Sequence, residues 1–204
     1  MNTTLTQEQK TARLGKFKGS ENYKLMDVKG FGKTGETYII ETVSEYLTGQ
    51  PIKPEFTSQA TQWGIDHEPE AKLHFEAATG LKIEIVGTKN NDLIVGTPDG
   101  KILDASIGFE IKCPYNQGNH VKNLLLTDQV GLLELHPEYF WQIYSYMWIF
   151  GWDQYKFCSY DPRFKEEKRM MILNIQKEEN YMKALQARVT EAKLMFENIL
   201  SKLK

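Results

Sequence analysis

Residues 97–114 read TPDGKILDASIGFEIKCP, and this stretch decides the fold. Pro98-Asp99-Gly100 is a turn signal, and short alternating strand patterns follow it at 101–103 and 109–112. Two short strands separated by a few polar residues predict a hairpin. When the hairpin folds back, Asp99 at its start comes close to Glu110 in the second strand.

The spacing of the polar residues in the second strand indicates chemistry. Residues two apart on a strand share a face, so Glu110 and Lys112 lie together while Phe109 and Ile111 face the core. Carboxylates suit Mg²⁺, and the backbone carbonyl of Ile111 is a further oxygen. A lysine beside the ion can orient water or stabilise developing negative charge. With Asp99, this pattern follows the logic of the PD-(D/E)xK nucleases, although a surface turn and strand can also produce it by chance.

Two helices on either side of this stretch supply further polar groups. We expect a helix over 58–78, bent near 64–68 because it contains Gly64 and Pro69, and Glu68 can supply a third carboxylate from it. A strongly aromatic helix is expected over 137–151, and it contains Gln142. Burying a glutamine is costly unless its amide is hydrogen-bonded, so we expect Gln142 to point toward the site.

The remaining pattern places helices around a central group of strands. Helices are expected at 6–17, 37–47 and 178–203, a loop at 27–35, and further strands at 82–86, 93–97, 155–160 and 170–175. This order predicts an α/β fold with a central mixed β-sheet flanked by helices. We expect one nuclease domain over 1–204: a helical part to about residue 80, a sheet core over about 81–175 and a final helix over about 178–203.

Composition excludes several classes of protein. The formal net charge is −2, so a histone-like DNA-coating protein, which carries a large positive excess, is not expected. Two cysteines are too few for a disulfide framework or an iron–sulfur cluster and fit a reducing compartment. The chain has neither an apolar run long enough to span a membrane nor a signal peptide. A cytoplasmic protein without membrane contact is the expectation.

Five blocks of sequence together resemble the bacteriophage lambda exonuclease group of viral recombinases. They are residues 63–75, TPDG at 97–100, EIKCP at 110–114, WQIYSYMW at 141–148 and SYDPRFK at 159–165. The resemblance runs from about Arg13 to the last helix. It implies a restriction-endonuclease-like PD-(D/E)xK core and a 5′-to-3′ exonuclease that digests one strand of duplex DNA. It also implies two Mg²⁺ ions, with Mn²⁺ as a substitute.

The resemblance further implies partners and a setting. Proteins of this group form a ring-shaped homotrimer around DNA ends and work with a single-strand annealing protein in recombination. A phage or prophage origin, in a bacterial cytoplasm, is therefore expected.

Roles carry over residue by residue onto matching positions. Asp99 and Glu110 match the metal-binding carboxylates, with Ile111 contributing its carbonyl, and Glu68 matches the helix carboxylate, acting directly or through water. Lys112 matches the catalytic lysine.

The resemblance also implies a grip on the 5′-phosphate of the digested strand. Arg13 and Ser20 match its arginine and serine, Gln142 matches the glutamine near the scissile phosphate, and Thr97 stands where the family has a related hydroxyl. An arginine offers a fork of donors to phosphate. From the residues alone, Arg13 also fits a solvated helix charge.

Two other functions stay open from the sequence. One is a restriction or repair endonuclease on the same core, and the other is a non-catalytic DNA-binding module. The complete set of Glu68, Asp99, Glu110 and Lys112 argues against the non-catalytic module. Cleavage of a closed circular duplex would distinguish an endonuclease from an exonuclease.

Overall fold

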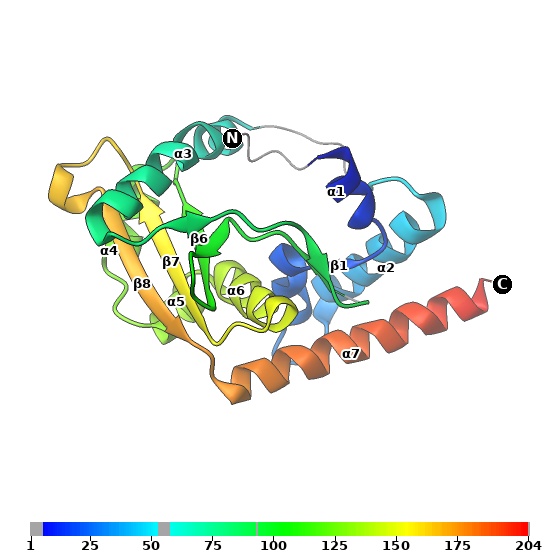
Figure 1. Ribbon diagram of the computed structural model, residues 1–204. Helices are drawn as coiled ribbons and strands as arrows, with labels where there is room; N and C mark the ends of the chain where they lie inside the picture. The colour runs from blue at the N-terminus through cyan, green and yellow to red at the C-terminus, as the bar shows by residue number, and fades with distance from the viewer. Residues whose placement is uncertain (1–5, 53–57, 93, 204) are drawn as a thin grey trace.

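The computed structural model describes residues 6–52, 58–92 and 94–203. Within them the strands form a mixed five-stranded sheet and a separate three-stranded sheet (Figure 1). The larger sheet has the order β2 (Ile83–Glu84), β5 (Gly100–Ile102), β6 (Ile107–Lys112), β7 (Gln154–Tyr160) and β8 (Met170–Gln176). The smaller sheet has the order β1 (Phe17–Lys18), β4 (Ile94–Gly96) and β3 (Lys89–Asn90).

Helices surround these sheets in the order of the chain. They are α1 (Gln7–Ala12), the 3-10 helix η1 (Gly19–Leu25), α2 (Gly32–Thr48), α3 (Gln59–Thr79), α4 (Gln117–Leu124), α5 (Gln129–Leu135), α6 (Pro137–Phe150), the 3-10 helix η2 (Glu166–Lys168) and α7 (Glu179–Lys202). The mixed α/β class expected from the sequence is confirmed. None of the described helices is long and apolar enough to cross a membrane.

The larger sheet is covered on both faces. Phe109 and Ile111 of β6 pack with Phe75 of α3 on one face. On the other face, Phe157 of β7 belongs to the large core that contains most of α6 and the inner side of α7. Glu110 is only 1% exposed and lies on the α6 side. The alternation in β6 therefore places its polar side chains where α6 can contact them.

The predicted hairpin is present. Strands β5 and β6 pair antiparallel, with Gly100 opposite Phe109, and Asp99 stands immediately before β5. Strand β6 continues the sheet by pairing in parallel with β7, so that Lys112 lies opposite Ser159. This register places Asp99, at the start of β5, next to the final residues of β6.

Several predicted elements differ from the structure. The first helix ends at Ala12 rather than near 17. Gly15 adopts a left-handed φ of 65° where it packs against Tyr46, and Phe17 belongs to β1, in which it pairs with Ile94 of β4. The predicted loop 27–35 is too long, since α2 begins at Gly32.

Other differences lie further along the chain. Helix α3 is one helical segment that runs through Pro69, without an interruption there. Helices α4 and α5 were not predicted. In the predicted strand 93–97, residue 93 lies outside the described residues and β4 ends at Gly96.

Candidate active site

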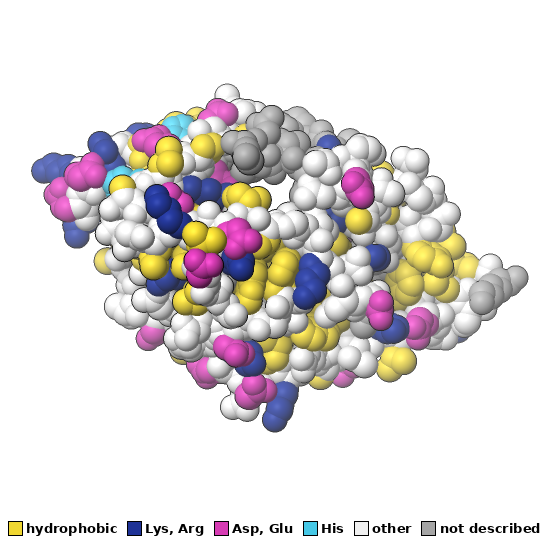
Figure 2. Space-filling model, in the orientation of Figure 1, with side chains coloured by type: hydrophobic (Ala, Val, Ile, Leu, Met, Phe, Trp, Pro, Cys, Tyr) yellow, Lys and Arg dark blue, Asp and Glu magenta, His cyan; other side chains and the backbone are white. Residues whose placement is uncertain are grey.

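A cleft of about 600 Å³ opens where β6 ends. Its walls come from the first half of α3, the turn before β5, the end of β6 and the start of α4 and α6. In the space-filling view this face is hollowed between the α3 side and the side of α1 and α2 (Figure 2). Glu68, Asp99, Ile111 and Lys112 all line the cleft, so the structure brings these four predicted residues together.

Backbone and side-chain hydrogen bonds fix the turn that carries Asp99. Its Oδ2 accepts a hydrogen bond from the backbone N–H of Ile111 at 2.9 Å, which ties the turn to β6. Lys72 of α3 donates to the backbone carbonyl of Asp99 at 2.8 Å and lies 2.7 Å from Oε1 of Glu68. Lys72 therefore holds the carboxylate of Glu68 and the backbone of the turn that carries Asp99 in one arrangement.

Glu110 is the most enclosed acid of the site. Its Oε1 accepts hydrogen bonds from Nζ of Lys112 and from Nε2 of Gln142, the latter at 2.7 Å. The same Gln142 nitrogen lies 3.2 Å from the hydroxyl of Tyr146. The second oxygen, Oε2, is buried, and no group among the described residues donates to it. A buried carboxylate oxygen without a donor is costly, so it is suited to a cation.

The pKa shifts of the site residues indicate an excess of negative charge in a buried environment. Burial, and then the charge of Asp99, raise the pKa of Glu110 to about 8. The same two causes raise the pKa of Glu68. Burial by itself would lower the pKa of Lys112, but the nearby Glu110 and Asp99 carboxylates raise it above its ordinary value. Lys112 therefore stays charged, and the two lysines Lys72 and Lys112 do not balance the three acids Glu68, Asp99 and Glu110.

The donor set fits Mg²⁺ in type. Mg²⁺ needs one or two carboxylates, keeps several waters and takes further oxygens from substrate phosphate. Asp99 and Glu110 with the Ile111 carbonyl supply such a set, and the unpaired Oε2 of Glu110 is the observation that supports it. The described part of the chain contains no group of three or more His, Cys, Asp and Glu side chains already arranged around an ion position. The acids instead bond Lys112 and Lys72.

The N-terminal residues predicted to hold a phosphate, Arg13 and Ser20, do not line this cleft, but their segments contact residues close to it. Arg13 follows α1, and its Nη1 is 3.5 Å from Oγ1 of Thr97, two residues before Asp99. Ser20 lies in η1, next to Gly19. The backbone of Gly19 packs closely against Tyr146, since a Cβ added to this glycine would stand only 2.7 Å from the tyrosine ring. Because Tyr146 is also hydrogen-bonded to Gln142, contacts run from η1 through Tyr146 and Gln142 to Glu110.

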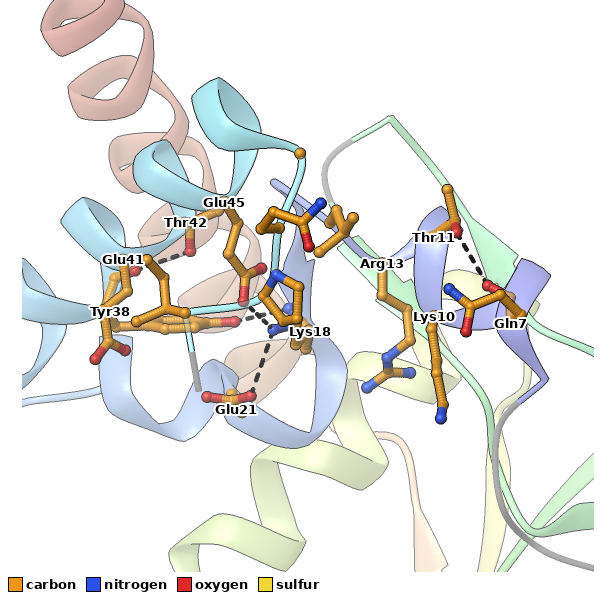
Figure 3. Close-up of a pocket in the computed structure, with 15 residues that line it drawn as sticks. Gln7, Lys10, Thr11, Arg13, Lys18, Glu21, Tyr38, Glu41, Thr42 and Glu45 are labelled. Atoms are coloured by element: carbon orange, nitrogen blue, oxygen red, sulfur yellow. Dashed lines mark hydrogen bonds and ion pairs between the residues drawn. The ribbon is translucent and has the colours of Figure 1, made fainter. Parts of the chain in front are cut away.

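A second cavity of about 700 Å³ lies on the other side of Arg13, between α1 and α2. In Figure 3, Arg13 and Lys10 extend in the same direction along it. Lys18 at its centre is paired with Glu45 at 2.9 Å, and its backbone N–H donates to the hydroxyl of Tyr38 at 2.7 Å. This cavity is larger and is also lined by carboxylates, those of Glu21, Glu41 and Glu45. The acids predicted from the sequence, Glu68 and Asp99, line the other cleft beside Lys112, so we place the chemistry there.

Sequence reasoning missed three residues of the site. Lys72 follows Glu68 by one helical turn, and this spacing was the available signal. Tyr139 and Tyr146 belong to the aromatic helix over 137–151, for which the sequence indicated only Gln142 as a site residue. In the structure the Tyr139 ring lies 5.1 Å from Nζ of Lys112, and Tyr146 contacts Gln142. Their positions three residues before and four after Gln142 put all three side chains on one side of α6.

Comparison with known proteins gives three findings. A family model described as a YqaJ-like viral recombinase domain matches residues 10–153. The structure is similar to that of an alkaline exonuclease, LHK-Exo, from Laribacter hongkongensis in complex with dAMP: the TM-score is 0.83, the identity 26%, and the match covers 98% of this chain and 96% of that one. A phage-related exonuclease from Haemophilus somnus 129PT shares the fold, with a TM-score of 0.76, 17% identity and coverage of 93% and 96%. No curated protein matches the chain.

Proposed function

Because the chain belongs to the YqaJ-like viral recombinase family and is a nuclease, we propose that it is a Mg²⁺-dependent exonuclease that digests one strand of double-stranded DNA in the 5′-to-3′ direction. One observation carries the proposal: a buried Glu110 bonds both Lys112 and Gln142, and this lysine lines a cleft together with Asp99. A charged lysine beside clustered carboxylates is an arrangement suited to the metal-dependent hydrolysis of a phosphodiester.

Asp99, Glu110 and the Ile111 carbonyl would hold the ion, with Glu68 acting through water and Mn²⁺ as a substitute; we propose two ions in the working site. When bound, the metal supplies an activated water and neutralises charge on the phosphate under attack. The buried, hydrogen-bonded setting of Glu110 keeps its carboxylate in place, so little rearrangement is needed when substrate enters.

Lys112 and Gln142 act on the reacting groups. The lysine is held over the Tyr139 ring and beside Glu110, so its ammonium faces the cleft in a fixed position. There it orients the attacking water and stabilises negative charge that develops on the phosphate oxygens. The amide of Gln142 holds Glu110 and lies near the scissile phosphate.

Arg13, Ser20 and Thr97 give the reaction its direction. Arg13 lies within 3.5 Å of the Thr97 hydroxyl, and η1 with Ser20 packs against the tyrosine that contacts Gln142. A terminal 5′-phosphate bound by these groups and by Gln142 is held in a fixed position relative to the metal site. An arginine–phosphate pair is charge-assisted and directional, which suits this task.

We further propose a homotrimeric ring around the DNA end, working with a single-strand annealing protein in the cytoplasm of a bacterial host. Hydrophobic side chains gather on the surface near α2 and α7 (Figure 2). On these two helices, large exposed hydrophobic side chains are Ile40, Tyr46 and Leu47 of α2 and Leu194 of α7. Burial of such a patch between copies of the chain would be favourable.

The test compares linear and covalently closed duplexes of the same sequence, each with Mg²⁺. We expect mononucleotide release from the linear duplex, beginning at 5′ ends, and an intact closed circle. Lys112→Ala serves as the control for contaminating nuclease. Cutting of the closed circle by the wild type would favour the endonuclease, and no cleavage of either would contradict the proposal.

A further inference from the structure

The rim of the cleft carries an exposed aromatic ring that the proposed chemistry does not use. Tyr115, three residues after Lys112, lines the cleft and is 48% exposed. Its ring stands edge-on to that of Trp63 in α3, with centroids 6.0 Å apart and an interplanar angle of 72°. Trp63 in turn stacks on His67. The two walls of the cleft therefore meet in an aromatic cluster, and one face of that cluster is open to solvent.

Arg163, from the segment after β7, holds this cluster in position. Its guanidinium carbon lies 4.2 Å from the centre of a Trp63 ring. Its Nη2 donates to the backbone carbonyls of Pro114 at 3.1 Å and Tyr115 at 3.0 Å. Asp161, which is fully buried, accepts hydrogen bonds from Nε and Nη2 and so anchors the arginine. The SYDPRFK block thus braces the backbone that presents Tyr115.

This arrangement has the features of a base-stacking position. A flat, half-exposed ring at the entrance of a cleft for a nucleic acid offers a surface that every base can cover. The brace orders the ring before substrate arrives, which reduces the entropy cost of binding. Arg163 already donates to Asp161 and to two carbonyls, so it acts here as support rather than as the principal phosphate ligand.

We propose that Tyr115 stacks one nucleobase of the digested strand, close to the scissile phosphate, and that Trp63 and Arg163 position it. The inference rests on the proposed function and adds a contact with a base to a site otherwise built for phosphate and metal. Because stacking tolerates all bases, the subsite contributes affinity without sequence preference.

The experiment combines a variant with a modified substrate. A single abasic residue is moved through the first few positions of the 5′-phosphorylated strand, and kcat/KM is measured with Mg²⁺. For the wild type we expect about a tenfold fall at one position, the size of one lost stacking contact. Tyr115→Ala should show that fall on the unmodified duplex and no further fall at the abasic position. Tyr115→Phe, which keeps the ring, should behave as the wild type.

Controls separate stacking from a structural effect. Leu103→Ala removes another half-exposed hydrophobic side chain, located between β5 and β6, and should keep the full sensitivity to the abasic residue. Arg163→Lys, which loses the planar fork, should raise KM more than it lowers kcat and weaken that sensitivity. If Tyr115→Ala does not fold, Tyr115→Leu takes its place in the same comparison.

The inference is overturned if the losses from Tyr115→Ala and the abasic residue multiply, or if the wild type is indifferent to the abasic residue at every position. Either result, obtained with an enzyme that still degrades linear duplex, leaves the proposed exonuclease standing. Absence of cleavage by the wild type would instead contradict the proposed function itself.

Discussion

The end of β6 and the segment around Arg13 differ in how firmly their charged groups are held. Glu110 is 1% exposed and bonds both Lys112 and Gln142, so its position is determined from two sides. Arg13 is partly exposed, and its hydrogen bond to Thr97 is long, at 3.5 Å. Chemistry requires donors that are in place before the reaction, whereas recognition of a strand end can be completed by the phosphate itself. Substitutions in the first region should therefore lower turnover, and those in the second should alter the preference for ends.

The largest effect is expected from the acids. Glu110→Gln and Asp99→Asn should each lower kcat by about a thousandfold or more, because the metal supplies several kcal/mol of stabilisation. Initial rates on a 5′-phosphorylated duplex with saturating Mg²⁺ measure this. Glu84→Gln, at an exposed acid on the neighbouring β2, is the matched control. Activity near that of the wild type in either variant would remove the metal site from this cleft.

Lys112→Ala should lower kcat by about a hundredfold to a thousandfold, as expected for loss of one group that stabilises transition-state charge. Binding of duplex should change little, because affinity for DNA comes from many phosphate contacts. Lys156→Ala, at a partly exposed lysine on β7 that bonds Asn174, is the control. Kinetics and a binding titration at one stated salt concentration give both quantities. A large loss of binding with normal turnover would assign Lys112 to docking instead.

Gln142→Ala tests whether the amide that holds Glu110 matters. Substitution of a group that orients a metal ligand typically lowers activity by about 10- to 100-fold. We expect a fall in kcat within that range. Gln154→Ala, at an exposed glutamine at the start of β7, should have no such effect. Equal activity of the two variants would show that the hydrogen bond to Glu110 has no part in the reaction.

The smallest effect is expected at the strand end. The wild type should begin faster on 5′-phosphorylated than on 5′-hydroxyl duplex, and Arg13→Ala should remove about tenfold of that preference while leaving the Mg²⁺ requirement unchanged. Arg188→Ala, an arginine on α7 paired with Glu191, controls for loss of a positive charge. Equal initial rates of the wild type on the two duplexes would return Arg13 to the status of a surface charge.

The two regions also differ in how well the sequence predicted them. The hairpin and the shared face of Glu110 and Lys112 follow from a turn signal and a period of two, which are local properties. Strand β1 depends on a parallel partner far along the chain, Ile94, and no local pattern at Phe17 reveals it. A predicted helix therefore extended over residues that are a short strand in the structure.

Helices α4 and α5 were missed for a different reason. Their sequences are short and contain Gly118 and Gly131, which lower helix propensity. The caps were nevertheless visible: Asn116 accepts from the N–H of Gly118 and Asp128 from that of Gly131. Contacts made across elements, such as that of Lys72 with the carbonyl of Asp99, depend on tertiary packing and lie beyond a reading of periodicity.

The most direct test of the account is to locate the metal. Crystals soaked in Mn²⁺ and measured on both sides of its absorption edge give an anomalous signal that changes at the ion alone. We expect that signal in the cleft, between the carboxylates of Asp99 and Glu110 and near the Ile111 carbonyl, and no signal there in Glu110→Gln crystals. Mn²⁺ bound elsewhere in the wild type, with these carboxylates still paired to Lys112 and the backbone, would contradict the account.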